Sequence, residues 1–223
     1  MTQAMKAYIS WVAAAGSVAI AAAVSECQFS HPVRFPIYFA LAVLVAMVKI
    51  RFTDVTGTFS CSSLFIILGL AELDITETML IACGAAAAQT LLNTKDKPNL
   101  VQLVFNIATL GVSTSAAALV KKTAEGAGGG PVAAIVCAAC CYYVVNTLLV
   151  AGILALIRAQ TVRRLWRAWL QWTTPAFLAS AAAAVALFTS NPMFHWGPTL
   201  LFIPAAVAFQ IWYRRLIGDQ LRA

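Results

Sequence analysis

Long hydrophobic runs, separated by short polar segments, follow one another along almost the whole chain. A membrane-spanning helix needs about 20 apolar residues, or somewhat fewer where neighbouring helices cover it. By that measure the pattern predicts about eight membrane elements. Their approximate bounds are 7–25, 35–48, 59–70, 75–92, 100–120, 132–157, 174–189 and 198–213. The third run is the shortest, and we interpret it as a half-span or re-entrant helix.

The composition supports lipid as the solvent of this chain. Of its residues 61% are hydrophobic and 10% are charged, whereas soluble domains are about 45–50% apolar and about 25% charged. The fold class predicted is therefore all-α, a polytopic transmembrane helical bundle that forms a single domain over residues 1–223. The net charge of +7 does not indicate nucleic-acid binding, because the basic residues lie in short clusters at the ends of apolar runs.

These clusters also predict an orientation. With alternate connections placed in the cytoplasm, 12 of the 15 Lys and Arg residues lie on that side, and only Arg34, Lys121 and Lys122 lie outside. Cytoplasmic loops of membrane proteins carry such an excess of basic residues. We therefore expect both chain ends in the cytoplasm, which requires the run 59–70 to reach the far side and the chain to return through 75–92.

One basic segment, residues 158–172, alternates arginine with tryptophan and leucine at helical spacing. Such a helix is typical of the membrane interface, where tryptophan faces the apolar side and arginine contacts anionic headgroups. The interface residues expected are Arg158, Arg163, Arg164, Trp166, Arg167, Trp169 and Trp172. The alternative is a helix that docks a partner protein.

The polar stretch 53–63 is the most unusual segment, because it contains glycine and leads into the short third run. Thr56, Gly57, Thr58 and Ser60 offer N–H and hydroxyl donors at the start of a helix, which is a common arrangement for binding an anion or a polar ligand. An ordinary surface loop with a Ser or Thr helix cap explains the same residues. Both interpretations stay open.

Uncharged polar residues within the apolar runs are the second candidate site. Gln89, Asn106 and Asn146 each lie well inside a hydrophobic run. Side chains of this kind face the interior of a bundle, where they bond across helices or line a cavity. If the three amides converge, we expect a small polar-ligand pocket; otherwise they join helices to one another.

Glu72, Asp74 and Glu77 lie at one helical connection and are expected to form a solvated acidic turn, with Asp74 or Thr76 capping the next helix. The alternative is that they gather cations or protons at the outer mouth of the bundle. His31 and His195 are isolated residues in expected external loops, so neither is expected to bind a metal.

Cysteines and motifs do not indicate an enzyme. Cys137, Cys140 and Cys141 lie close together, but they have no second CxxC pair and no nearby histidine, so packing explains them better than metal binding. Sequence motifs of metalloproteases, serine hydrolases, P-loops and dinucleotide sites are missing. We expect no metal, no cofactor and no catalytic activity.

Residues 48–92, VKIRFTDVTGTFSCSSLFIILGLAELDITETMLIACGAAAAQTLL, resemble the membrane-embedded sensor regions that precede cytoplasmic GGDEF or HD-GYP domains in some bacteria. The shared features are a polar G-T-x-S turn, a short apolar helix, an acid-containing break and a helix of small residues. Residues 97–109 continue the likeness, and the basic segment 213–223 resembles a linker to an output domain. No output domain lies within residues 1–223.

This resemblance implies a non-enzymatic sensor in the bacterial cytoplasmic (inner) membrane, which binds a ligand and signals through its last helix to a cytoplasmic partner. Residues 58–92 are more loosely similar to the substrate-binding membrane subunits of energy-coupling-factor transporters, although the glycine-rich break usual there is missing. That likeness implies solute capture with an ATPase partner. A structural subunit of a membrane complex is the third interpretation. The sequence does not indicate the ligand or the oligomeric state.

Overall fold

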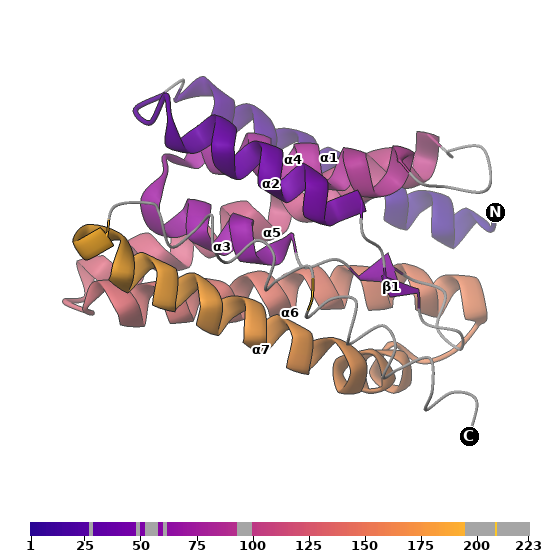
Figure 1. Cartoon of the computed structure of the whole chain (residues 1–223). Coiled ribbons are helices and arrows are strands. Elements are labelled where there is room, and N and C mark those ends of the chain that lie inside the picture. Colours follow the sequence, from indigo (N-terminus) through magenta and orange to yellow (C-terminus); the bar gives the residue numbers. More distant parts are fainter. Residues whose placement is uncertain are drawn as a thin grey trace.

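The computed structural model describes residues 1–26, 29–47, 50–51, 58–59, 62–92, 100–194 and 208. In that part of the chain nearly all residues are helical (Figure 1). The helices are α1 (Gln3–Ser25), α2 (Arg34–Met47), α3 (Ser63–Glu72), α4 (Ile75–Leu91), α5 (Leu100–Gly126), α6 (Pro131–Arg158) and α7 (Val162–Phe194). Two short strands, β1 (Ile50–Arg51) and β2 (Thr58–Phe59), form an antiparallel pair.

Within the described residues, four helical segments are long and apolar enough to cross a membrane: Gln3–Ser25, Leu100–Gly126, Pro131–Arg158 and Thr173–Ser190. α2, α3 and α4 are apolar but shorter. The all-helical fold with helices of membrane-spanning length is thus confirmed. The count of about eight elements and the cytoplasmic placement of both ends stay predictions, and the last expected run, 198–213, lies outside the described residues except for residue 208.

Successive helices run in alternate directions, so their connections gather at two ends of the bundle (Figure 1). We call the end that holds the N-terminus and the α6–α7 connection the proximal end. The opposite, distal end holds the α1–α2, α3–α4 and α5–α6 connections.

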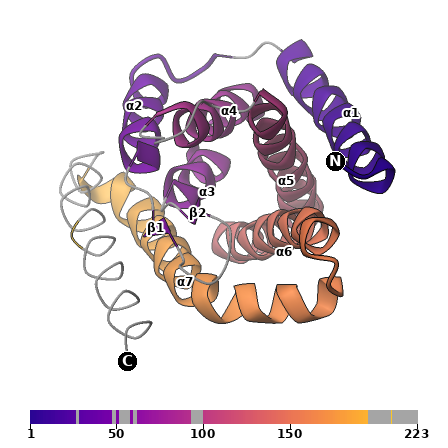
Figure 2. The ribbon, with the colours of Figure 1, turned by 90° about the vertical axis from the view of Figure 1, so that its right-hand side faces the viewer.

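The short helix α3 lies at the centre of the bundle, where it contacts α2, α4, α5, α6 and α7 (Figure 2). Every residue from Ser63 to Leu70 is buried. A helix that is apolar on all sides belongs in such a position. The run 59–70 was expected to be helical throughout, but Phe59 belongs to β2 and the helix begins at Ser63.

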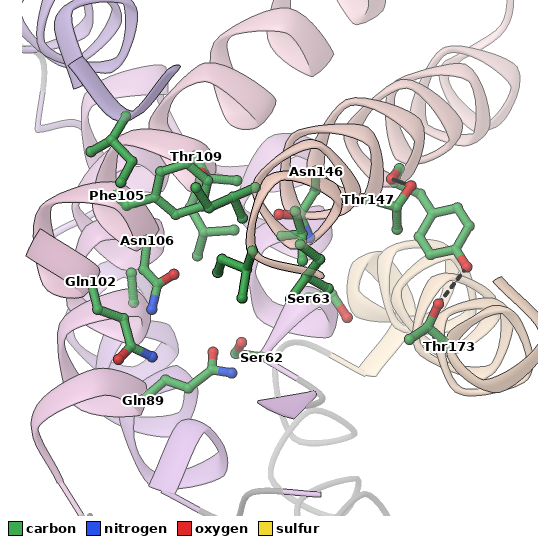
Figure 3. A pocket seen from close by; sticks show the side chains of 18 of the residues that line it. Ser62, Ser63, Gln89, Gln102, Phe105, Asn106, Thr109, Asn146, Thr147 and Thr173 are labelled. Atoms are coloured by element: carbon green, nitrogen blue, oxygen red, sulfur yellow. Dashed lines mark hydrogen bonds between the residues drawn. The ribbon is translucent and has the colours of Figure 1, made fainter. Parts of the chain in front are cut away.

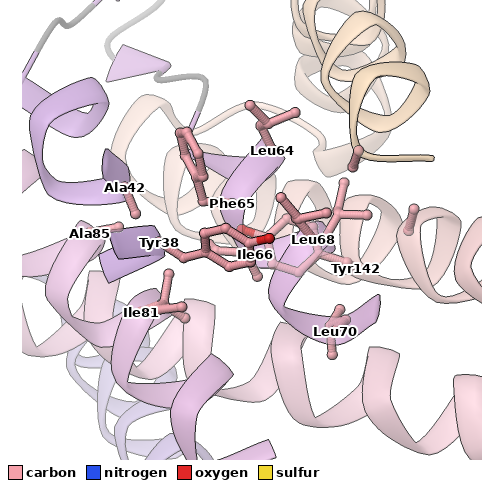
Figure 4. Packing of buried hydrophobic residues seen from close by; sticks show 14 of the residues in the cluster. Tyr38, Ala42, Leu64, Phe65, Ile66, Leu68, Leu70, Ile81, Ala85 and Tyr142 are labelled. Carbon is pink, nitrogen blue, oxygen red and sulfur yellow. The ribbon is translucent and has the colours of Figure 1, made fainter. Parts of the chain in front are cut away.

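Apolar side chains from the surrounding helices pack against α3 (Figure 4). Tyr38 and Ala42 of α2, Ile81 and Ala85 of α4, and Tyr142 of α6 are all buried in this cluster. The alanines keep the helix backbones close together, as small residues do in membrane bundles.

Helix α7 departs from the expected pattern of an interfacial helix followed by a separate span. It is continuous from Val162 to Phe194 and passes through Pro175. Figure 2 shows its first part lying across the proximal end before the helix turns to run along the bundle. Proline removes one backbone hydrogen bond and bends a helix without always ending it, which explains why the sequence pattern indicated a boundary there.

Candidate ligand-binding cavity

A cavity of about 680 Å³ lies toward the proximal end, between α1, α3, α4, α5, α6 and α7 (Figure 3). Its size is within the range of about 300–1,000 Å³ that is usual for ligand pockets. Both apolar and uncharged polar side chains line it. The polar ones are Ser62, Ser63, Gln89, Gln102, Asn106, Thr109, Tyr142, Tyr143, Asn146, Thr147 and Thr173.

The three amides singled out from the sequence meet at this cavity, although they come from three helices. Asn106 on α5 also bonds across to α4, because its Nδ2 donates to Thr90 Oγ1 over 2.9 Å. Asn146 on α6 has no hydrogen-bond partner among the described residues, and Gln89 on α4 lies on the same wall as Ser62 in Figure 3. Asn106 therefore joins helices and lines the cavity at once.

Two further lining residues carry buried hydroxyl groups without a partner. Within the described part of the structure, nothing hydrogen-bonds to Ser63 Oγ or to Thr109 Oγ1, and these residues are 5% and 2% exposed. A buried polar group left unpaired costs about 1–3 kcal/mol. Thr78 and Thr114 also have buried hydroxyls without a partner in the described structure, but they do not line the cavity.

The candidates in the polar stretch have a different outcome. Thr56, Gly57 and Ser60 lie outside the described residues. Thr58 belongs to β2, where it pairs with Arg51, and so it is not at the start of a helix as was expected. The residues that do begin α3 at the cavity are Ser62 and Ser63, which the sequence reasoning included in the stretch but did not single out.

Two cavity-lining residues of α6, Tyr143 and Thr147, form hydrogen bonds to α7. Trp166 Nε1 donates to Thr147 Oγ1 over 3.0 Å. The hydroxyl of Tyr143 lies 2.8 Å from those of Thr173 and Thr174, and its ring stacks on Phe177 with centroids 4.3 Å apart. Lining residues of α6 thus hold both parts of α7.

The expected interface residues on this segment are partly visible. Arg163, Arg164 and Arg167 are exposed, whereas Arg158 and Trp166 are half-buried. Trp169 and Trp172 lie in α7, but their side chains are outside the description. The exposed arginines and the inward Trp166 agree with the amphipathic pattern, while contact with headgroups stays a prediction.

Glu72, Asp74 and Glu77 accept hydrogen bonds, and Glu77 is buried while the other two are half-buried, so the prediction of a solvated turn is wrong. Glu77 is completely buried. Its carboxylate accepts from the backbone N–H of His31 at 2.9 Å and of Asp74 at 3.2 Å, and lies 2.9 Å from His31 Nδ1. Glu72 accepts from the Tyr38 hydroxyl at 2.6 Å and pairs with Arg34 at 3.6 Å. These bonds join the α1–α2 connection to α3 and α4.

His31, Asp74 and Glu77 are also the described residues that could hold a metal ion, since their ligand atoms lie within 4.8 Å of one another. The expectation that His31 is isolated fails because the fold brings it to Glu77 from 46 positions away. Asp74 caps α4 as expected. The hydrogen bonds among the three account for their arrangement without an ion.

Cysteine positions differ from the packing role that was expected. Cys137 and Cys140 on α6 are exposed on the outside of the described bundle, and Cys141 is half-buried. In a membrane that outer face meets lipid or another protein. Cys83, on α4, is half-buried.

Comparison with protein-family models found a match to MASE9 over residues 17–194. The chain belongs to the MASE9 family. MASE domains are membrane-associated sensor domains, so the resemblance to bacterial membrane sensor regions is confirmed at that level. The MASE9 match includes every cavity-lining residue except Met1, Met5 and Ile9. A search of curated proteins found no match, and a search of solved structures found none either.

Proposed function

We propose that this MASE9 chain is a non-enzymatic sensor of the bacterial inner membrane, which binds a small ligand in the cavity and signals to a cytoplasmic partner. The observation that carries the proposal is the convergence of Gln89, Asn106 and Asn146 on one cavity that also has two unpaired hydroxyls in its wall. Polar groups are costly in a membrane interior. A bound ligand that pairs with them recovers part of that cost.

The contacts between α6 and α7 support a route for the signal. Thr147 lines the cavity and accepts the bond from Trp166, while Tyr143 lines it and bonds to Thr173. A ligand that moves either α6 residue changes the position of the arginine-rich start of α7. The run 198–213, which the sequence predicts as the relay helix, lies outside the described residues except for residue 208.

In this proposal the proximal end faces the cytoplasm. The exposed Arg163, Arg164 and Arg167 lie there and would contact the anionic headgroups of the inner leaflet. Each such basic residue contributes about 1 kcal/mol to attraction toward an anionic surface. The start of α7 would then report the ligand at the membrane surface, where a signalling partner can reach it.

The test is complementation of a deletion strain with the wild-type gene and with a triple variant, Gln89→Ala, Asn106→Ala and Asn146→Ala. A variant at the exposed residue Thr189, Thr189→Ala, is the control. We expect the triple variant to behave as the deletion in a genome-wide transcript comparison, at equal membrane abundance by immunoblot. Wild-type behaviour of the triple variant would disprove the cavity as the sensing site.

Vesicle transport separates this proposal from solute uptake. A transporter or substrate-capture subunit would accumulate solute in sealed vesicles, driven by a gradient or by an ATPase partner. We expect no such uptake. A structural subunit would instead retain its partner when the three amides are replaced, and its partner would cover the outer face of α6 that carries Cys137 and Cys140.

A further inference from the structure

The two sides of the cavity differ in chemistry. Its hydroxyls and amides come mainly from the start of α3, the end of α4 and the facing sides of α5 and α6. Toward α1 the lining is apolar, because Met5 and Ile9 of α1 pack with Phe105 of α5 and Ile153 of α6. Figure 3 shows Phe105 apart from Gln89 and Ser62, on another side of the cavity.

The described lining residues carry no side-chain charge. None of the described residues around the cavity is Asp, Glu, Lys, Arg or His, and the ionisable groups are the amino terminus of Met1 and the phenols of Tyr142 and Tyr143. An ionised group removed from water without a counter-charge is strongly disfavoured. The cavity therefore favours an uncharged ligand.

Part of the hydrogen-bonding capacity at the polar side is unused in the part of the chain that the structure describes. Ser63 and Thr109 are more than nine-tenths buried, and each has a hydroxyl without a partner in the described structure. Asn146 adds an amide that both donates and accepts. A ligand carbonyl accepts from such hydroxyl and amide groups, and a ligand hydroxyl bonds to them in either direction.

We propose that the cavity binds an uncharged amphiphile, whose carbonyl- or hydroxyl-bearing head pairs with Ser63, Thr109 and Asn146 and whose hydrocarbon part lies against α1. The inference rests on the proposed sensor function and names the class of its ligand. Membrane quinones and neutral acyl amides share this chemistry.

The position of α1 agrees with a ligand that arrives through the bilayer. α1 lies at the periphery of the bundle (Figure 2). Close packing against α5 holds its middle, since a Cβ on Gly16 would meet the Ala108 Cα at 2.4 Å. Nearer the N-terminus Tyr8 donates to the carbonyl of Leu149 over 2.9 Å. The apolar side of the cavity is thus covered by one helix, which separates it from lipid.

Binding is tested with the full chain in neutral phosphatidylcholine nanodiscs. The probes are decanamide and a ubiquinone with one isoprenoid unit, and empty nanodiscs give the correction for partitioning into lipid. Decanoate at about pH 8, where a carboxyl is ionised, has a similar tail with a charged head. Acetamide has the head without the tail. We expect saturable binding of at least one neutral amphiphile, and its identity separates a quinone from an acyl amide as the source.

A matched pair of variants tests where the polar head of the ligand binds in the cavity. Thr109→Val removes a lining hydroxyl, and Thr114→Val removes an equally buried, equally unpaired hydroxyl of α5 away from the cavity. We expect Thr109→Val to raise the Kd of the bound probe about three- to tenfold, the effect of one lost hydrogen bond. Thr114→Val should leave the Kd unchanged. Both substitutions conserve shape, so unfolding does not confuse the comparison.

Several results would overturn the inference. They are equal Kd values for the two valine variants, decanoate binding as tight as decanamide, or no saturable binding of either neutral amphiphile. Saturable binding of acetamide alone, lost on Asn146→Ala, would overturn the amphiphile while leaving the sensor proposal in place. Failure of the sensor itself is shown separately, by wild-type transcripts in the triple variant.

Discussion

The two ends of this bundle use polar side chains in opposite ways. At the distal end, ionisable side chains of distant segments are bonded to one another, as Glu77 is to His31 and Glu72 to Arg34. Around the proximal cavity, the described polar lining residues are uncharged, and the buried hydroxyls of Ser63 and Thr109 have no hydrogen-bond partner in the described structure. The first arrangement fastens helices together, and the second retains bonding capacity for a ligand.

This contrast explains how a sensor can be both stable and responsive. The bonds to Glu72 and Glu77 hold their segments together, because a buried acceptor or donor left without its partner costs free energy. Amides and hydroxyls in a cavity cost less when unpaired, and a ligand can satisfy them. We expect stability to depend mainly on the distal end and ligand response mainly on the proximal cavity.

The largest expected effect on stability is from Glu77→Ala. The substitution leaves His31 and the Asp74 N–H without their buried partner. A donor left without its buried acceptor costs about 1–3 kcal/mol, and two backbone N–H groups lose theirs, so the unfolding midpoint in mild detergent should fall. Glu125→Ala removes an exposed pair with Lys121, whose loss is worth about 0–1 kcal/mol. Equal midpoints for the two variants would contradict the fastening role of the distal end.

A smaller loss is expected from Gly16→Ala, since the new methyl group would overlap Ala108 and push α1 away from α5. Overpacking of this kind costs about 1–3 kcal/mol. Because α1 covers the apolar side of the cavity, decanamide binding should weaken along with stability. Gly126→Ala is the control, as nothing lies within 4 Å of its added Cβ. Unchanged binding in Gly16→Ala would show that α1 does not shape the cavity.

Trp166→Phe tests the connection from the cavity to α7. It keeps the aromatic ring but removes the bond to Thr147, which is worth about 0.5–1.5 kcal/mol. We expect transcript output in the complemented strain to fall while the Kd for the amphiphile stays within about twofold. Normal output would place the relay elsewhere.

The smallest effect is expected from metal removal. Glu77 and Asp74 already accept hydrogen bonds at the distal end, so treatment with EDTA should leave the unfolding midpoint of the wild-type chain unchanged. A midpoint that falls with EDTA and recovers with Zn²⁺ would instead make His31, Asp74 and Glu77 a metal centre, and it would change the interpretation of that end.

Local patterns in the sequence predicted most element boundaries. The runs 35–48 and 75–92 differ from α2 and α4 by one residue at most at either end, because Asp74 caps one helix and a polar connection precedes the other. Pro175 wrongly indicated the start of a separate helix, because a proline that bends a helix and one that marks a helix boundary give the same sequence pattern. In the structure the Tyr143 hydroxyl bonds to Thr173 and Thr174 beside it.

The polar sites could be predicted from the sequence only in part, because they depend on contacts between residues far apart in the chain. Gln89, Asn106 and Asn146 could be singled out because amides are conspicuous in apolar runs. The hydroxyls of Ser63 and Thr109 could not be singled out in the same way. Ser and Thr within helices often bond to their own backbone, as Ser113 does to the carbonyl of Thr109. The pairing of His31 with Glu77 has no local pattern, because it depends on how two connections meet.

The shortness of α3 has a consequence for permeability. Its ten residues span about 15 Å, which is about half of a bilayer's hydrocarbon thickness. They run from the cavity at Ser63 to the bonded Glu72 at the distal end, and Ile66, Ile67 and Leu68 are completely buried on the way. A solute in the cavity therefore still faces a tightly packed apolar barrier, and a membrane that contains this chain should hold its electrical potential.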